Sequence, residues 1–91
     1  MNSTSDWKIY FKPRALKNLK NLPRAFQERI AEKMRFFISS GNPMRFTKNL
    51  KDKFLGDYRF RVGDYRIVVD IIADKKEIIV LKVGKRDEVY R

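Results

Sequence analysis

The sequence contains no cysteine and no histidine among its 91 residues. Without cysteine, the chain cannot form disulfides, ligate an iron–sulfur cluster or use a thiol as nucleophile. These two residue types are also the usual zinc ligands, so a metal site would have to be built from carboxylates alone. The 11 acidic residues are scattered and are outnumbered two to one by 22 lysines and arginines. We therefore predict no metal site and no cofactor.

Long apolar segments are also missing from the chain. No apolar run approaches the roughly 20 residues that a transmembrane helix requires. The polar residues 1–6 lack the charged and apolar regions of a secretory signal. We predict a cytoplasmic protein that does not contact membranes. A chain of 91 residues can bury one core, so residues 1–91 are expected to form a single domain, with residues 1–6 flexible.

Positive charge dominates what is present, because the formal net charge is +11 at pH 7. A field of this size attracts polyanions and repels itself, which makes nucleic acid the first partner class to consider. Two other interpretations remain open. The charge can belong to a soluble domain whose helices are covered with lysine, or it can serve an acidic protein partner whose binding relieves the repulsion.

Hydrophobic periodicity predicts two helices after a short initial strand at residues 7–11. Pro13 begins a helix that extends to about Lys20. Pro23 begins a longer helix with an apolar side, and Gly41-Asn42-Pro43 ends it. The mixed-charge side of the longer helix is expected to face solvent.

Three more strands are predicted at about residues 57–62, 65–73 and 77–83, after a basic connection over residues 44–53. The element order is therefore β-α-α-β-β-β, which indicates an α+β domain. We expect an N-terminal helical hairpin packed on one face of a mainly antiparallel four-stranded sheet.

The most informative segment is residues 57–66, Asp-Tyr-Arg-Phe-Arg-Val-Gly-Asp-Tyr-Arg. It predicts a β-hairpin in which Gly63-Asp64 forms a two-residue type II′ turn, with glycine supplying the positive φ. Arg61 then lies directly opposite Arg66. Like charges in that position are destabilising, whereas favourable cross-strand pairs contribute about 0.2–1 kcal/mol. An anionic ligand would remove this local cost.

Strand alternation assigns side chains to the two faces of the sheet. Tyr58, Phe60 and Val62 point toward the helices, whereas Arg59 and Arg61 point away from them. The next strand places these residues on the open face: Arg66, Val68, Asp70 and Ile72. An exposed Val68 and Ile72, extended by Ile78 and Val80, predict a protein-binding strip. A tail of the chain covering this strip is the alternative.

The C-terminal residues 83–91 contain a basic turn followed by Tyr90. A regular second hairpin places the last strand beside residues 65–73, so its exit can bring Arg86 and Tyr90 near Arg66. Clustered arginines hold phosphate through bidentate, charge-assisted hydrogen bonds, and tyrosine can stack on a base or share a proton. This combination suits RNA better than a small acidic metabolite.

The chain resembles the RelE-like toxins of bacterial and archaeal toxin–antitoxin pairs. The resemblance runs from Pro13-Arg-Ala-Leu-Lys through Leu50 and is densest in residues 57–66, Val83-Gly-Lys-Arg86 and Val89-Tyr90. It implies a type II toxin that is a metal-independent endoribonuclease, cleaving messenger RNA in the ribosomal A site through attack by the ribose 2′-hydroxyl. The implied partners are mRNA, the 70S ribosome and a cognate antitoxin that forms a hetero-oligomer with the toxin.

The resemblance places the catalytic side chains at Arg59, Arg61, Arg66, Arg86 and Tyr90. Residues 59 and 61 are arginines, whereas the best-known ribosome-dependent member has lysines there. Arginine does not readily act as a base because its pKa exceeds about 12. The proton-transfer group is therefore open, with Lys85 or the ribosomal RNA as candidates.

Further contacts are predicted from the basic residues around this set. We expect RNA contacts from Arg45, Lys48, Lys51, Lys53, Lys82 and Lys85, although a plain surface loop explains residues 44–53 equally well. Val68 and Ile72 are predicted to bind the antitoxin. Two other functions remain open: a non-enzymatic ParE-like inhibitor of DNA gyrase, and a non-catalytic nucleic-acid-binding relative.

Overall fold

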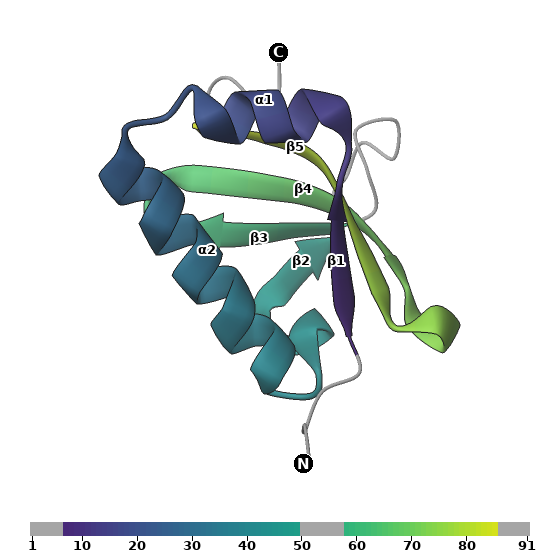
Figure 1. The fold of residues 1–91 in the computed structure, drawn as a ribbon. Coiled ribbons are helices and arrows are strands. Elements are labelled where there is room, and N and C mark those ends of the chain that lie inside the picture. The colour runs from purple at the N-terminus through teal and green to yellow at the C-terminus, as the bar shows by residue number, and fades with distance from the viewer. Residues whose placement is uncertain (1–6, 50–57, 86–91) are drawn as a thin grey trace.

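A computed structural model describes residues 7–49 and 58–85, and Figure 1 shows two helices on one face of a single sheet. Residues 1–6, which were expected to be flexible, lie outside the described residues. The elements in chain order are β1 (Lys8–Phe11), α1 (Pro13–Lys20), α2 (Arg24–Ser39), the 3₁₀ turn η1 (Pro43–Phe46), β2 (Thr47–Asn49), β3 (Tyr58–Val62), β4 (Tyr65–Ile72), the 3₁₀ turn η2 (Ala73–Lys75) and β5 (Glu77–Lys85).

The sheet has five strands in the order β1-β5-β4-β3-β2, so the predicted number of four was wrong. The additional strand is β2, which pairs antiparallel with β3 inside the predicted basic connection. Its three residues are too few to show a period-two pattern, and their strand conformation depends on the partner strand. The mainly antiparallel character is confirmed, although β1 pairs parallel with β5.

The two helices begin and end close to their predicted limits, and Pro13 occupies the start of α1. In α1, Ala15 is fully buried whereas Leu16 is exposed. Figure 1 shows α1 over β5 and α2 crossing the sheet at an angle to α1. The two helices lie on one face of the sheet as predicted, but the helical hairpin differs in detail, because α1 contacts β5 more extensively than it contacts α2.

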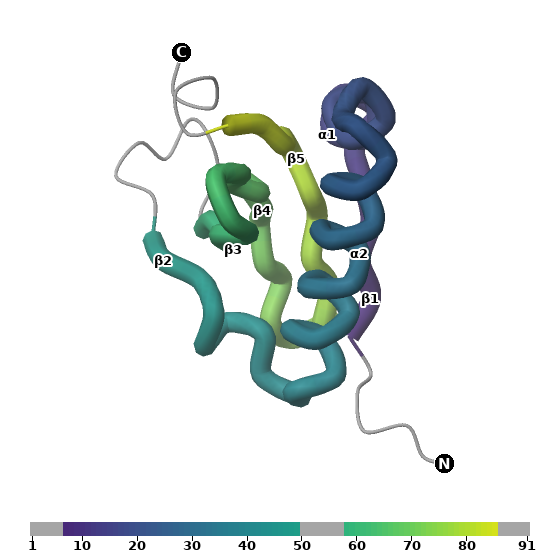
Figure 2. Tube along the Cα trace, turned by 90° about the vertical axis from the view of Figure 1, so that its left-hand side faces the viewer, coloured from purple at the N-terminus to yellow at the C-terminus, as the bar shows by residue number. Residues whose placement is uncertain are grey.

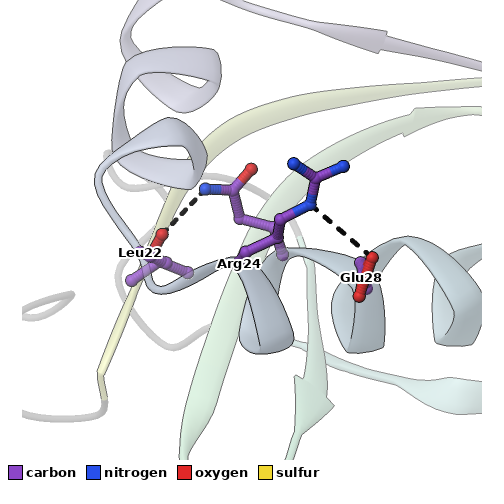
Figure 3. Close-up of polar contacts among 4 residues, drawn as sticks. Leu22, Arg24 and Glu28 are labelled. Atoms are coloured by element: carbon purple, nitrogen blue, oxygen red, sulfur yellow. Dashed lines mark hydrogen bonds and ion pairs between the residues drawn. The ribbon is translucent and has the colours of Figure 1, made fainter.

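The connection between the helices is closed by the side chain of Gln27. Its Nε2 donates hydrogen bonds to the carbonyl oxygens of Leu22, at 2.7 Å, and Lys20, at 3.2 Å. Arg24 and Glu28, on either side of Gln27 in the sequence of α2, form an exposed ion pair at 3.8 Å (Figure 3). Exposed pairs of this kind add little stability, and this one lies within α2, so the contacts of the Gln27 amide are what join α2 to the end of α1.

The core lies between α2 and the sheet, and Figure 2 shows these two layers edge-on. Ile30, Met34 and Phe37 are the buried residues of α2. The ring of Phe37 stacks on Phe60 of β3, with 4.9 Å between centroids and 8° between planes. This aromatic contact attaches the helix to the strand that carries Arg59 and Arg61.

The first hairpin has the predicted register. Arg61 is the partner of Arg66, and Val62 is the partner of Tyr65. Gly63 has φ of +59°, whereas Asp64 is not among the residues with positive φ, which is the sign pattern of a type II′ turn. A Cβ at Gly63 would meet no atom within 4 Å. The glycine is therefore favoured by the positive φ of the turn, and not by steric crowding around its Cα atom.

The second hairpin contains an irregularity that the sequence did not indicate. Val68 pairs with Lys82 but Val69 pairs with Val80, so Leu81 is an extra residue in β5. One inserted residue moves the side chains that follow it, such as those of Lys82, to the other face. Ile78 and Val80 come before the bulge and pair with Ile71 and Val69 of the helix side, so they are fully buried there, and their predicted place in an open strip was wrong.

Candidate nucleic-acid interface

The face of the sheet opposite the helices carries two cross-strand rows of side chains. Residues directly opposite each other in an antiparallel pair project from the same face. One row crosses four strands and the other crosses three. Their members follow from the strand register: Lys48, Arg59, Val68 and Lys82 in the first row, and Arg61, Arg66 and Gly84 in the second.

A small hollow of about 60 Å³ lies where these rows approach β2, and we call it the cationic hollow. The described residues that line it are Phe46, Lys48, Arg59, Arg61 and Arg66. Four of these five side chains are cationic, and none is acidic. This arrangement is chemically suited to an anion with several oxygen atoms, because arginine forks match phosphate geometry.

The guanidinium groups of the hollow differ in exposure. Arg66, in the central strand β4, is only 6% exposed and is the buried charged residue of the described chain. Arg59 is half-buried and Arg61 is exposed. A charge held at low exposure interacts more strongly with a bound anion than a fully solvated charge does. The hollow thus has a buried cationic floor at Arg66 and an accessible side at Arg61.

Phe46 forms the aromatic wall of the hollow, and this role was not predicted from the sequence. Its ring stacks on Phe37 at 4.8 Å and 26°, which joins the wall to the core. The guanidinium carbon of Arg45 lies 5.8 Å from the centroid of the same ring. The signal in the sequence was an aromatic residue between basic residues at 45 and 48, a pattern typical of nucleic-acid contacts.

The structure brings together part of the predicted site. Arg59, Arg61 and Arg66 meet in the hollow, Lys48 joins them, and Arg45 lies beside its wall. Lys82 is in the first row but beyond Val68, and it is not among the lining residues. The other predicted residues lie outside the described residues: Lys51, Lys53, Arg86 and Tyr90.

Lys85 is directed to the other side of the sheet. It is the partner of Tyr65, whose buried ring belongs to the helix-side core. Lys85 instead lines a larger hollow of about 370 Å³, together with Phe26, Arg29 and Asp64. The smaller hollow is the better candidate for an anion, because the larger one mixes apolar walls with charges of both signs.

The predicted apolar strip is only partly present. Val68 is fully buried, so the expectation that it is exposed was wrong. It lies between Arg59 and Lys82 in the first row, and the aliphatic stems of such residues cover apolar neighbours. Ile72 is 37% exposed as expected, and Tyr10 is 47% exposed on β1 at the other edge.

Two features are absent from residues 7–49 and 58–85. No three acidic side chains gather there in a way that could hold a metal ion. In the same residues, neither helix has the length and apolar composition needed to cross a membrane.

Comparisons with known proteins agree with this architecture. The family model that matches residues 9–90 describes the ParE toxin of the type II toxin-antitoxin system parDE. Toxin RelG of Mycobacterium tuberculosis is 28% identical over 83 residues, which cover 91% of this chain and 94% of RelG.

Solved structures of toxin–antitoxin complexes are similar as well. The RelBE2 complex of M. tuberculosis gives a TM-score of 0.76 at 25% identity, covering 88% of this chain and 98% of the matched one. The archaeal RelE-RelB complex of Pyrococcus horikoshii gives a TM-score of 0.69 at 28% identity, covering 88% of this chain and 94% of the matched one. The Escherichia coli RelBE complex gives a TM-score of 0.68 at 26% identity, covering 87% of this chain and 95% of the matched one. The chain therefore belongs to the ParE toxin family and is a RelE-like toxin of the RelE/ParE superfamily of type II toxin–antitoxin systems.

Proposed function

We propose that this toxin is an endoribonuclease that cleaves mRNA in the ribosomal A site. In this reaction the ribose 2′-hydroxyl attacks the adjacent phosphate without a metal ion, and the 5′-oxygen of the next nucleotide leaves. The observation that carries the proposal is the cationic hollow, in which three arginines and a lysine line one site. A phosphate bound there would contact several charge-assisted donors at once.

The arginines have two tasks in the proposed reaction. Arg61 and Arg66 bind the scissile phosphate and stabilise the negative charge that grows on its oxygens, while Arg59 positions the backbone. Stabilisation of the transition state by about 4 kcal/mol corresponds to roughly a thousandfold in rate. We assign further phosphate binding to Arg86, and base stacking or proton exchange to Tyr90, as the family resemblance implies.

The proposed protein partner is an antitoxin that forms a hetero-oligomer with this toxin in the cytoplasm. Two observations support it. The similar structures include complexes of RelE toxins with RelB antitoxins, and the net charge of +11 favours an acidic partner. Ile72 remains the exposed apolar residue that we propose for this contact.

Mapping RNA ends after brief expression tests the nuclease. The wild type is expected to produce new mRNA ends within translated regions, and Arg86→Ala and Tyr90→Ala are expected to remove most of them without loss of folded protein. Lys17→Ala is the control, because Lys17 is an exposed basic residue of α1. Normal cleavage by both purified site variants would contradict the assigned roles.

A second function is favoured by one observation, namely that the matching family model is that of the ParE toxin. A ParE-like protein would inhibit DNA gyrase without cutting RNA. A supercoiling assay with purified gyrase separates the two, because the nuclease is expected to leave supercoiling unchanged. A third alternative, a non-catalytic nucleic-acid-binding relative, would bind RNA with strong salt dependence and leave it intact.

A further inference from the structure

One member of the cationic hollow differs chemically from the other cations. Lys48 is the lysine among the described lining residues, whereas Arg59, Arg61 and Arg66 are guanidinium groups. A guanidinium keeps its proton, because its pKa exceeds about 12. The lysine ammonium carries three donor protons on a flexible four-carbon stem, and lysine serves in proton transfer where arginine does not. Phe46, the fifth lining residue, has no proton to transfer.

The position of Lys48 is suited to the leaving side of the reaction. It lies in the edge strand β2, directly opposite Arg59 of β3, and its side chain is exposed. Neighbouring strands are about 4.8 Å apart, so Lys48 is one strand from Arg59 and Arg61 and two from the buried Arg66. A phosphate held by the arginines would have the ammonium at its open side, where solvent can restore a proton.

Lys85, the lysine considered from the sequence for proton transfer, is less well placed. It lines the 370 Å³ hollow on the helix side of the sheet and is not among the lining residues of the cationic hollow. The register that pairs it with Tyr65 fixes this orientation. Of Lys48 and Lys85, it is therefore Lys48 that lies in the same hollow as the arginines.

We propose that Lys48 is the general acid of the cleavage reaction, an inference that rests on the proposed endoribonuclease function. The 2′-oxygen forms a bond to phosphorus and gives up its proton to solvent. The bond between phosphorus and the 5′-oxygen breaks, that oxygen keeps the bonding electron pair, and it takes a proton from the ammonium nitrogen Nζ of Lys48. The products are a 2′,3′-cyclic phosphate and a free 5′-hydroxyl. Water then returns a proton to the neutral amine of Lys48.

The test separates proton donation from positive charge. Lys48→Arg keeps the charge but removes the readily transferred proton, so cleavage of ordinary RNA is expected to fall by about 10²–10⁴-fold, the usual contribution of general acid catalysis. RNA binding should change little. The substrate is mRNA on programmed ribosomes, with the cleavage position first mapped with wild-type protein.

A second substrate carries sulfur in place of the 5′-oxygen at the mapped linkage. A thiolate leaves without protonation, so Lys48→Arg is expected to cut this RNA at close to the wild-type rate. Lys8→Met is the control, because Lys8 is exposed on β1 at the opposite edge of the sheet. It should cut both substrates normally.

The outcomes distinguish this inference from the function on which it rests. If Lys48→Arg cleaved both substrates equally slowly, or cleaved both at the wild-type rate, the acid role of Lys48 would be overturned while the nuclease function would stand. A wild-type protein that binds ribosomes but cuts neither substrate would overturn the nuclease itself.

Discussion

Arg61 lies directly opposite Arg66 across the first hairpin, and Arg66 is only 6% exposed. Two guanidinium groups on paired strands repel each other, and Arg59 and Lys48 add positive charge to the same hollow. Like charges directly opposite each other are destabilising in a sheet, and a bound anion would relieve this cost, which supports the proposed phosphate site. The pairing of Arg61 with Arg66 is therefore expected to lower the stability of the fold while it supports the proposed function.

Arg61→Gln is expected to stabilise the folded protein and to weaken RNA cleavage. Removing one member of the like-charge pair should raise the free energy of unfolding by about 0.2–1 kcal/mol. Urea denaturation at low salt measures this change, and the gain should shrink at high salt because the repulsion is screened. Arg14→Gln on α1 is the matched control at an exposed position. A lower stability for Arg61→Gln at low salt would contradict this account.

Arg66→Lys tests whether a guanidinium fork is needed at the buried position. Lysine keeps the charge but cannot form two parallel hydrogen bonds to phosphate. We expect cleavage to fall by roughly 10²-fold or more, comparable to losing an oxyanion donor. Single-turnover cleavage rates measure the effect, with Arg14→Lys as the control. Unchanged rates would show that Arg66 acts only as a positive charge.

Asn18→Ala is expected to loosen the contact between α1 and β5. The Oδ1 atom of Asn18 accepts a hydrogen bond from the backbone N–H of Val83 at 3.1 Å. Leaving this part-buried donor unsatisfied should lower the free energy of unfolding by about 1–3 kcal/mol. Thermal or urea denaturation measures the loss. Asn21→Ala, at the exposed end of the same helix, should have a much smaller effect.

Lys76→Gly is expected to stabilise the second hairpin. Lys76 has φ of +54°, a left-handed conformation that costs a non-glycine residue about 1–2 kcal/mol. Glycine avoids this cost but loses more backbone entropy on folding, about 0.5–1 kcal/mol, so the net gain should be below about 1.5 kcal/mol. Lys75→Gly, in the preceding 3₁₀ turn, should destabilise instead. Equal effects at both positions would contradict the conformational explanation.

The hairpin and the helices could be predicted because local signals specify them. Gly63-Asp64 flanked by alternating strands sets one register, so the pairing of Arg61 with Arg66 was available from sequence. Pro13 and Pro23 similarly located the helix starts. These features depend on neighbouring residues, which is where sequence reasoning is strongest.

The errors arose where distant contacts decide the structure. Ile78 and Val80 face the helices because they pair with Ile71 and Val69, and no local pattern reports the extra residue Leu81 that puts Lys82 on the opposite face from Val80. Strand β2 exists because β3 lies beside it, and Phe46 reaches the hollow because it stacks on Phe37. Val68 was placed on the correct face, but it is fully buried at its position between Arg59 and Lys82 in the first row.

The chemistry of the RNA ends tests the central claim most directly. Purified toxin is incubated with mRNA on programmed ribosomes, and the 3′ ends of the upstream fragments are identified by mass spectrometry. Attack by the ribose 2′-hydroxyl in the cationic hollow predicts 2′,3′-cyclic phosphate or its hydrolysis product, with 5′-hydroxyl ends downstream, and strongly reduced product from Arg66→Lys. Intact mRNA, or 3′-hydroxyl ends with 5′-phosphates, would contradict it.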